Sequence, residues 1–167
     1  MDKFELQRRT KKFHVDVMKL CENFPRHVTG FETAKQLIKA AGSVGANYRA
    51  ACRGKSKADF IYKIEVVLEE ADESLYWLEV TKEAGLINSQ FLDYLIAEGN
   101  ELVCIFNASD ITAKRNRNEE TPKSQNPKIP KSKNSSQHFA ERTWLIRQII
   151  LCFFNNKTRP RWAQGNL

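Results

Sequence analysis

Histidines, cysteines and paired acids are the side chains of this sequence that could do chemistry, and their spacing fits no catalytic or metal motif. The three histidines lie far apart and form no His-Glu-x-x-His pair. No two of the four cysteines are close enough for a Cys-x-x-Cys half-site, and none has a histidine beside it in sequence. The acidic pairs Glu69-Glu70 and Asp72-Glu73 lack the Glu-x-x-His motifs of a metal site inside a helical bundle. We therefore expect no enzymatic activity, no catalytic residue, no metal and no cofactor.

Two glycine-containing strings resemble phosphate-binding or nucleic-acid-binding loops, and both have a simpler interpretation. Gly54-Lys55-Ser56 ends like a phosphate loop, but that motif needs a glycine at the position of Arg49. Gly42-Ser43-Val44-Gly45 resembles a backbone clamp for nucleic acid, yet it lies inside an unbroken helical pattern, which favours close approach of two helices. Cys21 and Cys104 fall near apolar stripes, which favours buried packing over reactivity.

Four amphipathic helices must position whatever site the chain contains. Apolar residues recur at three-residue and four-residue spacing in four segments of residues 1–113. With only 7 glycines and 5 prolines in 167 residues, the chain has few turn-formers for a many-stranded β fold. Because the connections are short, we predict an all-α, antiparallel up-down-up-down four-helix bundle. The expected helix starts are the capping pairs Asp2 with Glu5, Thr29 with Glu32, and Ser56 with Asp59, followed by Asn88 or Ser89.

The remainder of the chain differs in composition. Residues 114–137 contain one aliphatic residue and three prolines among mostly Lys, Asn and Ser, which predicts a polar disordered linker. Residues 138–167 read as a short apolar helix with a basic tail, too short to span a membrane. We expect that helix to dock on protein, with a membrane surface as the minor alternative. The amino terminus has no apolar signal-peptide region, so a cytoplasmic location is expected.

Charge is distributed in blocks of alternating sign. Residues 1–60 carry 13 basic and 6 acidic side chains, residues 61–110 carry 2 and 11, and residues 111–167 carry 12 and 3. Within the second expected helix and the turn after it, cations recur on the side away from the apolar stripe and form a candidate nucleic-acid-binding surface. Its residues are Lys35, Lys39, Arg49, Arg53, Lys55 and Lys57. A flanking acidic stripe on the third helix is a candidate oligomer interface. Its residues are Glu65, Glu69, Asp72, Tyr76, Trp77 and Glu79.

Several strings in the bundle resemble a known family. They are the Phe24-Pro25 pair and the strings QLIKAAGSVGANYRAACRGKSKADFIYKI (36–64), EEADESLYWLE (69–79), AGLI (84–87) and EGNEL (98–102). Together they are similar to the bacterial four-helix bundle proteins also called 23S rRNA intervening-sequence proteins, and to the accessory variability proteins of diversity-generating retroelements. Ala50 departs from the glutamate expected in that pattern. The resemblance implies a cytoplasmic bacterial protein without known enzymatic activity that forms a ring of about five bundles. For the retroelement branch, it implies binding to nucleic acid and to a reverse transcriptase.

These observations lead to two hypotheses. The first is a ring-forming, non-enzymatic bundle, a pentamer by resemblance, that binds RNA or DNA without sequence specificity through the basic surface. No aromatic interleaving or base-reading motif accompanies these cations, so sequence-specific readout is not expected. The second is a protein-protein adaptor whose charged stripes serve assembly only.

Overall fold

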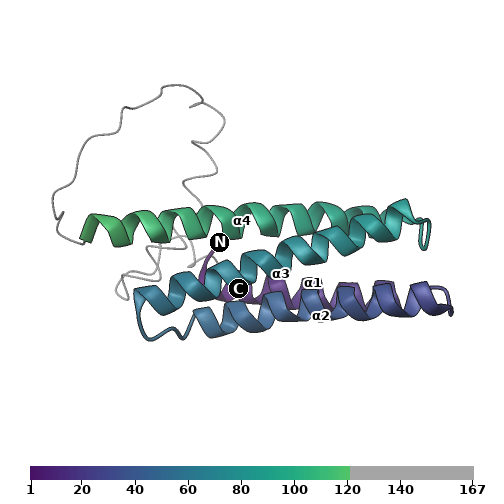
Figure 1. Ribbon diagram of the computed structural model, residues 1–167, viewed down its shortest axis with the longest axis horizontal. Helices are drawn as coiled ribbons and strands as arrows, with labels where there is room; N and C mark the ends of the chain where they lie inside the picture. Colours follow the sequence, from purple (N-terminus) through teal and green to yellow (C-terminus); the bar gives the residue numbers. More distant parts are fainter. Residues whose placement is uncertain (121–167) are drawn as a thin grey trace, which may run out of the picture.

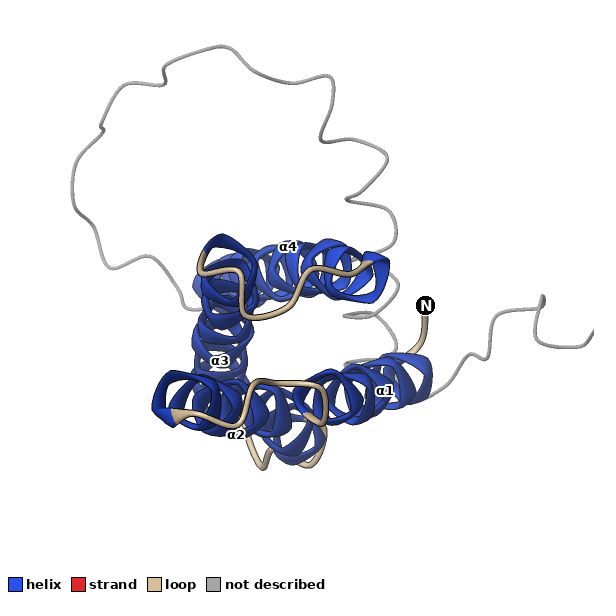
Figure 2. Ribbon diagram, turned by 90° about the vertical axis from the view of Figure 1, so that its right-hand side faces the viewer, coloured by secondary structure: helices blue, strands red, loops and turns tan. Residues whose placement is uncertain are grey.

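The computed structural model describes residues 1–120, with side chains through residue 118, and this part of the chain folds into four helices. The helices lie side by side along one long axis (Figure 1). Figure 2 shows the same bundle from one end. The all-α bundle expected from the sequence is confirmed. The tail at 138–167 and most of the expected linker lie outside the described residues. The helices are α1 (Lys3–Cys21), α2 (Val28–Ala51), α3 (Lys57–Glu83) and α4 (Gln90–Glu120).

Local side chains fix three helix starts where the sequence predicts them. Asp2 caps α1, because its carboxylate accepts from the backbone N–H of Glu5 at 2.7 Å while Glu5 accepts from the backbone N–H of Asp2 at 3.3 Å. Ser56 caps α3 by accepting from the N–H of Asp59 at 3.1 Å. Ser89 caps α4 by accepting from the N–H of Leu92 at 3.2 Å.

The predicted cap of α2 is wrong by two positions. The N-cap of α2 is His27, whose ring Nδ1 accepts from the backbone N–H of Gly30 at 3.2 Å. The Thr29 hydroxyl does not cap the helix but lies 2.8 Å from the same ring nitrogen. The imidazole therefore has the role that a hydroxyl or carboxylate oxygen usually has at an N-cap, because it accepts from one of the free backbone N–H groups of the first turn.

The predicted apolar stripes form the core. Helix α1 packs on α2 and α4, and α3 packs on the same two helices. Tyr48 and Phe106 meet near the centre with ring centroids 5.4 Å apart. Among the described residues, the largest fully buried aliphatic side chains come from all four helices and include Leu6, Leu20, Leu37, Ile64, Leu78, Leu92, Leu95 and Leu102.

The glycines of Gly42-Ser43-Val44-Gly45 face α1, as the helical interpretation predicts. A Cβ on Gly42 would lie 3.0 Å from Cε1 of His14, and one on Gly45 would lie 3.7 Å from the backbone and hydroxyl of Thr10. The close-approach prediction therefore holds at Gly42, whereas a Cβ at Gly45 would make only an ordinary contact with α1.

Helix α4 does not end at Ala113, where the sequence analysis places the end of the bundle. It continues through Lys114 to Glu120, into the expected linker. Ala113 is buried, and the Lys114 ammonium binds Glu65 of α3 at 2.6 Å and Asp110 at 2.7 Å. These contacts hold the last turns of α4 against α3. None of the helices in the described part of the chain is long and apolar enough to cross a membrane.

Candidate nucleic-acid interface

The outward face of α2 positions the predicted cations. Lys35, Lys39, Arg49 and Arg53 are all exposed. Leu37, on the opposite face of the same helix, is fully buried. Because a helix turns about 100° per residue, packing one face into the core forces the other face and its cations toward solvent.

The turn between α2 and α3 adds Lys55 and Lys57. The carboxylate of Asp59 accepts from the backbone N–H of Lys55 at 3.1 Å, which fixes the turn. A Cβ on Gly54 would lie 3.1 Å from the carbonyl oxygen of Ala51, so the glycine lets the chain pass close to the end of α2. Lys55 is exposed and Lys57 partly exposed, next to the exposed Arg53.

The six predicted cations are not equivalent, because acids reach only one part of the set. Lys35 lies 3.8 Å from Glu32 of its own helix. Lys39 faces Glu70 of α3: burial, with repulsion from Glu73, raises the pKa of Glu70, and Lys39 acts against that rise. The amino-terminal half of the basic face is therefore partly neutralised.

The cations in the carboxyl-terminal half of the basic face have no acidic partner among the described residues. Among the described residues, Arg49, Arg53 and Lys55 form no ion pair with an acidic side chain, and each is exposed. We call these three residues the basic corner. A helix C-terminus carries partial negative charge, which stabilises cations placed there. The basic corner can therefore bind an anionic ligand without breaking an internal pair.

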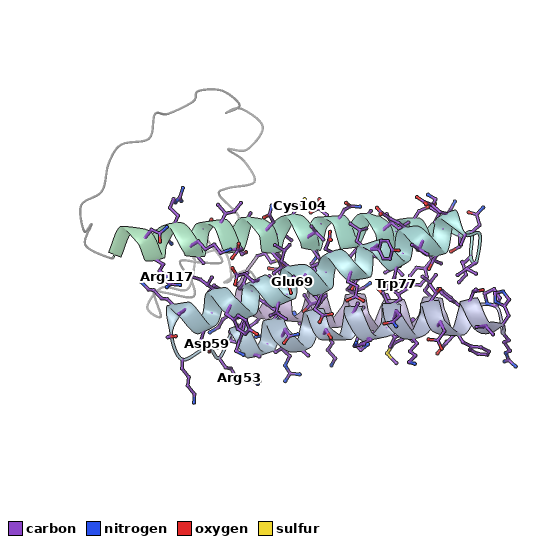
Figure 3. The ribbon with its side chains drawn as sticks, viewed as in Figure 1. Arg53, Asp59, Glu69, Trp77, Cys104 and Arg117 are labelled. Carbon is purple, nitrogen blue, oxygen red and sulfur yellow. The ribbon has the colours of Figure 1, made fainter. Side chains whose placement is uncertain are left out.

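The last turns of α4 bring further cations that the sequence analysis assigns to the linker. Arg115 and Arg117 are exposed, and Figure 3 shows Arg117 at the same end of the bundle as Arg53 and Asp59. No glycine or proline occurs between Gly99 and Pro122, and this uninterrupted run was the signal that the helix continues. This end of the bundle is therefore more basic than α2 alone suggests.

A second basic cluster lies on α1, and two of its cations have acidic partners. The cluster consists of Arg8, Arg9, Lys11 and Lys12. Arg9 forms a two-point pair with Glu98 of α4, at 2.6 and 2.8 Å, and this pair raises the pKa of Arg9. Lys12 pairs with the buried carboxylate of Asp16. Arg9 therefore ties α1 to α4, whereas Lys12 pairs within α1 and reaches α4 only through the Tyr94 hydroxyl at 3.2 Å. Both cations already have partners, unlike the basic corner.

The predicted interface residues on α3 also differ in whether they are free to contact a partner. Glu69, Asp72, Tyr76 and Glu79 are exposed on α3, and Figure 3 shows Glu69 midway along the bundle. Glu65 is paired with Lys114 of the same chain.

Trp77, also predicted at the interface, is only partly exposed. Its indole N–H donates to Glu73 at 3.2 Å, and its ring meets Tyr76 edge-on at 5.1 Å. Part of the predicted interface is thus used inside the molecule.

The cysteines differ from one another in environment. Cys21 is half-buried near the carbonyl of Ala34, and burial raises the pKa of its thiol to about 12, which favours the packing role. The same prediction is wrong for Cys104, which is exposed on the outer side of α4. It lies two residues from both Leu102 and Phe106, and a two-residue step turns a side chain to the opposite face of a helix. Among the described residues, no three histidine, cysteine or acidic side chains gather as a metal site requires.

A family model described as 23S rRNA-intervening sequence protein matches residues 2–108, which span α1, α2, α3 and the first part of α4. The chain belongs to this family. A solved protein of unknown function from the S23 ribosomal protein family of Bacteroides thetaiotaomicron has the same architecture, with a TM-score of 0.58 and 27% identity. The match covers 62% of this chain and 96% of that one. No curated protein matches.

The match to this 23S rRNA-intervening sequence protein family ends near the middle of the last helix. The basic face of α2 and the turn after it lie inside the matched range, whereas Arg115 and Arg117 lie beyond it. The cations at the end of α4 therefore lie outside the part of the chain that the family model matches.

Proposed function

We propose that this member of the 23S rRNA-intervening sequence protein family is a non-enzymatic, self-associating bundle that binds RNA through its basic corner. The observation that carries the proposal is that Arg49, Arg53 and Lys55 are exposed and form no ion pair within the described residues. Phosphate binding by cations releases counterions, so affinity for RNA is expected to fall steeply as salt concentration rises. Lys35 and Lys39 extend the contact along α2, more weakly because acids lie beside them.

The proposed binding is directed at the backbone of the nucleic acid. Arginine gives two-point contacts to phosphate oxygens, and Arg49 and Arg53 are four residues apart on one helix face, about 6 Å along its axis. That spacing is close to the separation of neighbouring phosphates, so both side chains can follow one strand. We expect a structured RNA and a duplex DNA both to bind, with affinity set by charge density.

The test is a titration of the full-length chain against a fluorescent structured RNA at several salt concentrations. The variant with Arg49→Glu and Arg53→Glu should lose at least about tenfold in affinity at low salt and show a smaller salt dependence. The matched control carries Lys19→Glu and Arg26→Glu, which change the net charge equally at the opposite end of the bundle. The control should bind within about twofold of the parent chain, apart from a general charge effect.

The competing hypothesis is a protein-protein adaptor. The absence of salt-sensitive RNA or DNA binding by the parent chain at low ionic strength would overturn the proposal and favour the adaptor. An equal loss in the corner variant and in the control would also overturn it, because attraction would then follow net charge and not the basic corner.

A further inference from the structure

Helix α1 carries a second stripe on the face opposite its buried one. Its residues recur at four-residue and three-residue spacing, and each is two positions away from a core residue. Three of them are apolar and exposed: Phe4 at 57%, Met18 at 45% and Val15 at 39%. Arg8 and Lys11 lie between Phe4 and Val15 and are also exposed. The α1 outer stripe therefore reads apolar, basic, apolar along the helix.

Helix α3 carries an outer stripe of the same design with the opposite charge. Tyr62 at 63% and Tyr76 at 55% are exposed, and each is followed four residues later by a partly exposed valine. Glu69 and Glu73 lie between these two apolar groups and are exposed. The α3 outer stripe, Tyr62, Val66, Glu69, Glu73, Tyr76 and Val80, reads apolar, acidic, apolar.

The central charges of both stripes form no ion pair within the described residues. Arg9 and Lys12, on the flank of α1 that faces α4, pair with Glu98 and Asp16. In the part of the chain that the structure describes, no such partner reaches Arg8 or Lys11. Arg9 and Lys12 thus have acidic partners within the molecule, whereas Arg8 and Lys11 are left to an external acid.

Glu69 and Glu73 likewise form no ion pair with any side chain of residues 1–118, and they lie beside Glu70, another acid. Glu73 accepts only the neutral indole N–H of Trp77. Repulsion among these neighbouring carboxylates favours a cationic partner, because a nearby positive charge would stabilise all of them.

We propose that the outer stripe of α1 binds the outer stripe of α3 in a second copy of this chain. Arg8 and Lys11 of one copy lie against Glu69 and Glu73 of the next, and the apolar groups on both sides close over the charged centre. The distance between the charged centre and the apolar group beyond it is the same in both stripes. In α1 that apolar group is Val15 with Met18, and in α3 it is Tyr76 with Val80. Each group lies about seven residues, or about 10 Å, from the charged centre of its own stripe.

The contact is head-to-tail. Helices α1 and α3 each pack on α2 and α4 and not on one another, so their outer faces are separate patches of the bundle (Figure 2). A two-fold dimer would place the same patch on both sides of the interface, whereas two different patches join copies into a ring or an open chain. The inference rests on the self-association in the proposed function and assigns the surfaces that produce it.

The experiment uses charge reversal in the full-length chain, with mass measured by light scattering. The first variant carries Arg8→Glu and Lys11→Glu, so that both of its outer stripes are acidic. The second carries Glu69→Lys and Glu73→Lys, so that both of its stripes are basic. Each variant alone should be monomeric at concentrations where the parent chain is assembled, because like charges then face each other across the contact.

An equimolar mixture of the two variants should again form species larger than the monomer, because the acidic stripes of one variant bind the basic stripes of the other. Strict alternation then gives open chains or rings with an even number of copies. This recovery also shows that both variants are folded. The matched control, Arg49→Glu with Arg53→Glu, should assemble like the parent chain, and the α1 variant should keep its RNA affinity within about twofold.

Assembly of both variants like the parent chain would overturn the assigned surfaces while leaving self-association intact. A mixture that stays monomeric would also overturn the charge matching. A parent chain that is monomeric at all concentrations tested would remove self-association itself and this inference with it, and RNA binding through the basic corner would be judged by its own titration.

Discussion

The two ends of the bundle use charge differently. At the end with the α1–α2 and α3–α4 connections, Lys82 pairs with Asp93 at 2.7 Å across the connection between α3 and α4. At the other end, Arg49 and Arg53 are exposed and form no ion pair within the described residues. Both ends carry cations, so composition does not separate them. Pairing distinguishes Lys82 from Arg49 and Arg53, because a cation that already has a carboxylate must give it up before it binds a phosphate.

The ends also differ in what the backbone requires. The α1–α2 connection brings Gly30 against the carbonyl of Pro25, and the α3–α4 connection contains Gly85, the one residue with a positive φ (65°) among the described glycines. The turn at the basic end is held by the side chains of Ser56 and Asp59. Substitutions of Gly30 and Gly85 at the first end should therefore affect stability, and substitutions of Arg49 and Arg53 at the basic end should affect binding.

The largest expected effect is at Gly30. In Gly30→Ala, the new Cβ would lie 2.1 Å from the carbonyl oxygen of Pro25, a backbone atom that cannot move without shifting the connection. We expect a loss of about 3 kcal/mol in the free energy of unfolding, measured by urea denaturation.

The matched control for this prediction is Gly99→Ala in α4. There the nearest atom, Cδ1 of Leu75, would lie at 3.5 Å, an ordinary contact. Helix propensity should then raise stability by about 0.5–1 kcal/mol. An equal loss in both variants would contradict the explanation by steric clash.

The second effect is at the basic end and concerns binding alone. Replacing Arg49 and Arg53 with glutamine should weaken RNA binding about tenfold, or about 1.4 kcal/mol, and lower the magnitude of the slope of log affinity against log salt by about 1.4–1.8. Neither side chain has an ion pair within the described residues, so only the attraction to the C-terminal end of α2 is lost, and the unfolding midpoint should fall by no more than about 4 °C. A large fall in the midpoint would show that these arginines stabilise the fold, and it would weaken the contrast between the two ends.

A third and smaller effect is expected at Gly85. Its φ of 65° is a left-handed conformation that a side chain disfavours, although open space surrounds the position. Gly85→Ala should cost about 1 kcal/mol of stability from backbone strain alone. Calorimetry can measure this loss, and Gly85→Asn should lose less, because asparagine tolerates that conformation better than alanine does.

The smallest effect is expected at the lysine pair of the same end. Lys82 and Asp93 are both about half exposed, so solvent screens their attraction. Lys82→Ala should change the free energy of unfolding by less than about 0.5 kcal/mol, and raising the salt concentration should shrink the difference further. A loss greater than about 1 kcal/mol would mean that the pair fixes the α3–α4 connection more firmly than exposed ion pairs do.

The sequence by itself determined the helices, their buried stripes and most of their caps. These features depend on residues within about four positions of one another, as in the capping box of Asp2 with Glu5. The side of α2 that carries cations was predictable for the same reason, because the position of a residue along a helix determines the direction in which its side chain points. The cap of α2 was predicted at the wrong residue, because the imidazole of His27 caps this helix where a hydroxyl is more usual.

Only the tertiary structure decided which charges remain available. Whether Lys114 reaches Glu65, or Arg9 reaches Glu98, depends on the register and rotation of helices that are far apart in sequence. That register is set by the packing of the whole core and not by neighbours along the chain. The pair of Lys35 with Glu32 is local to one helix and could be predicted from the sequence, whereas the fold alone places Lys39 beside Glu70 and leaves the basic corner without an acidic partner among the described residues.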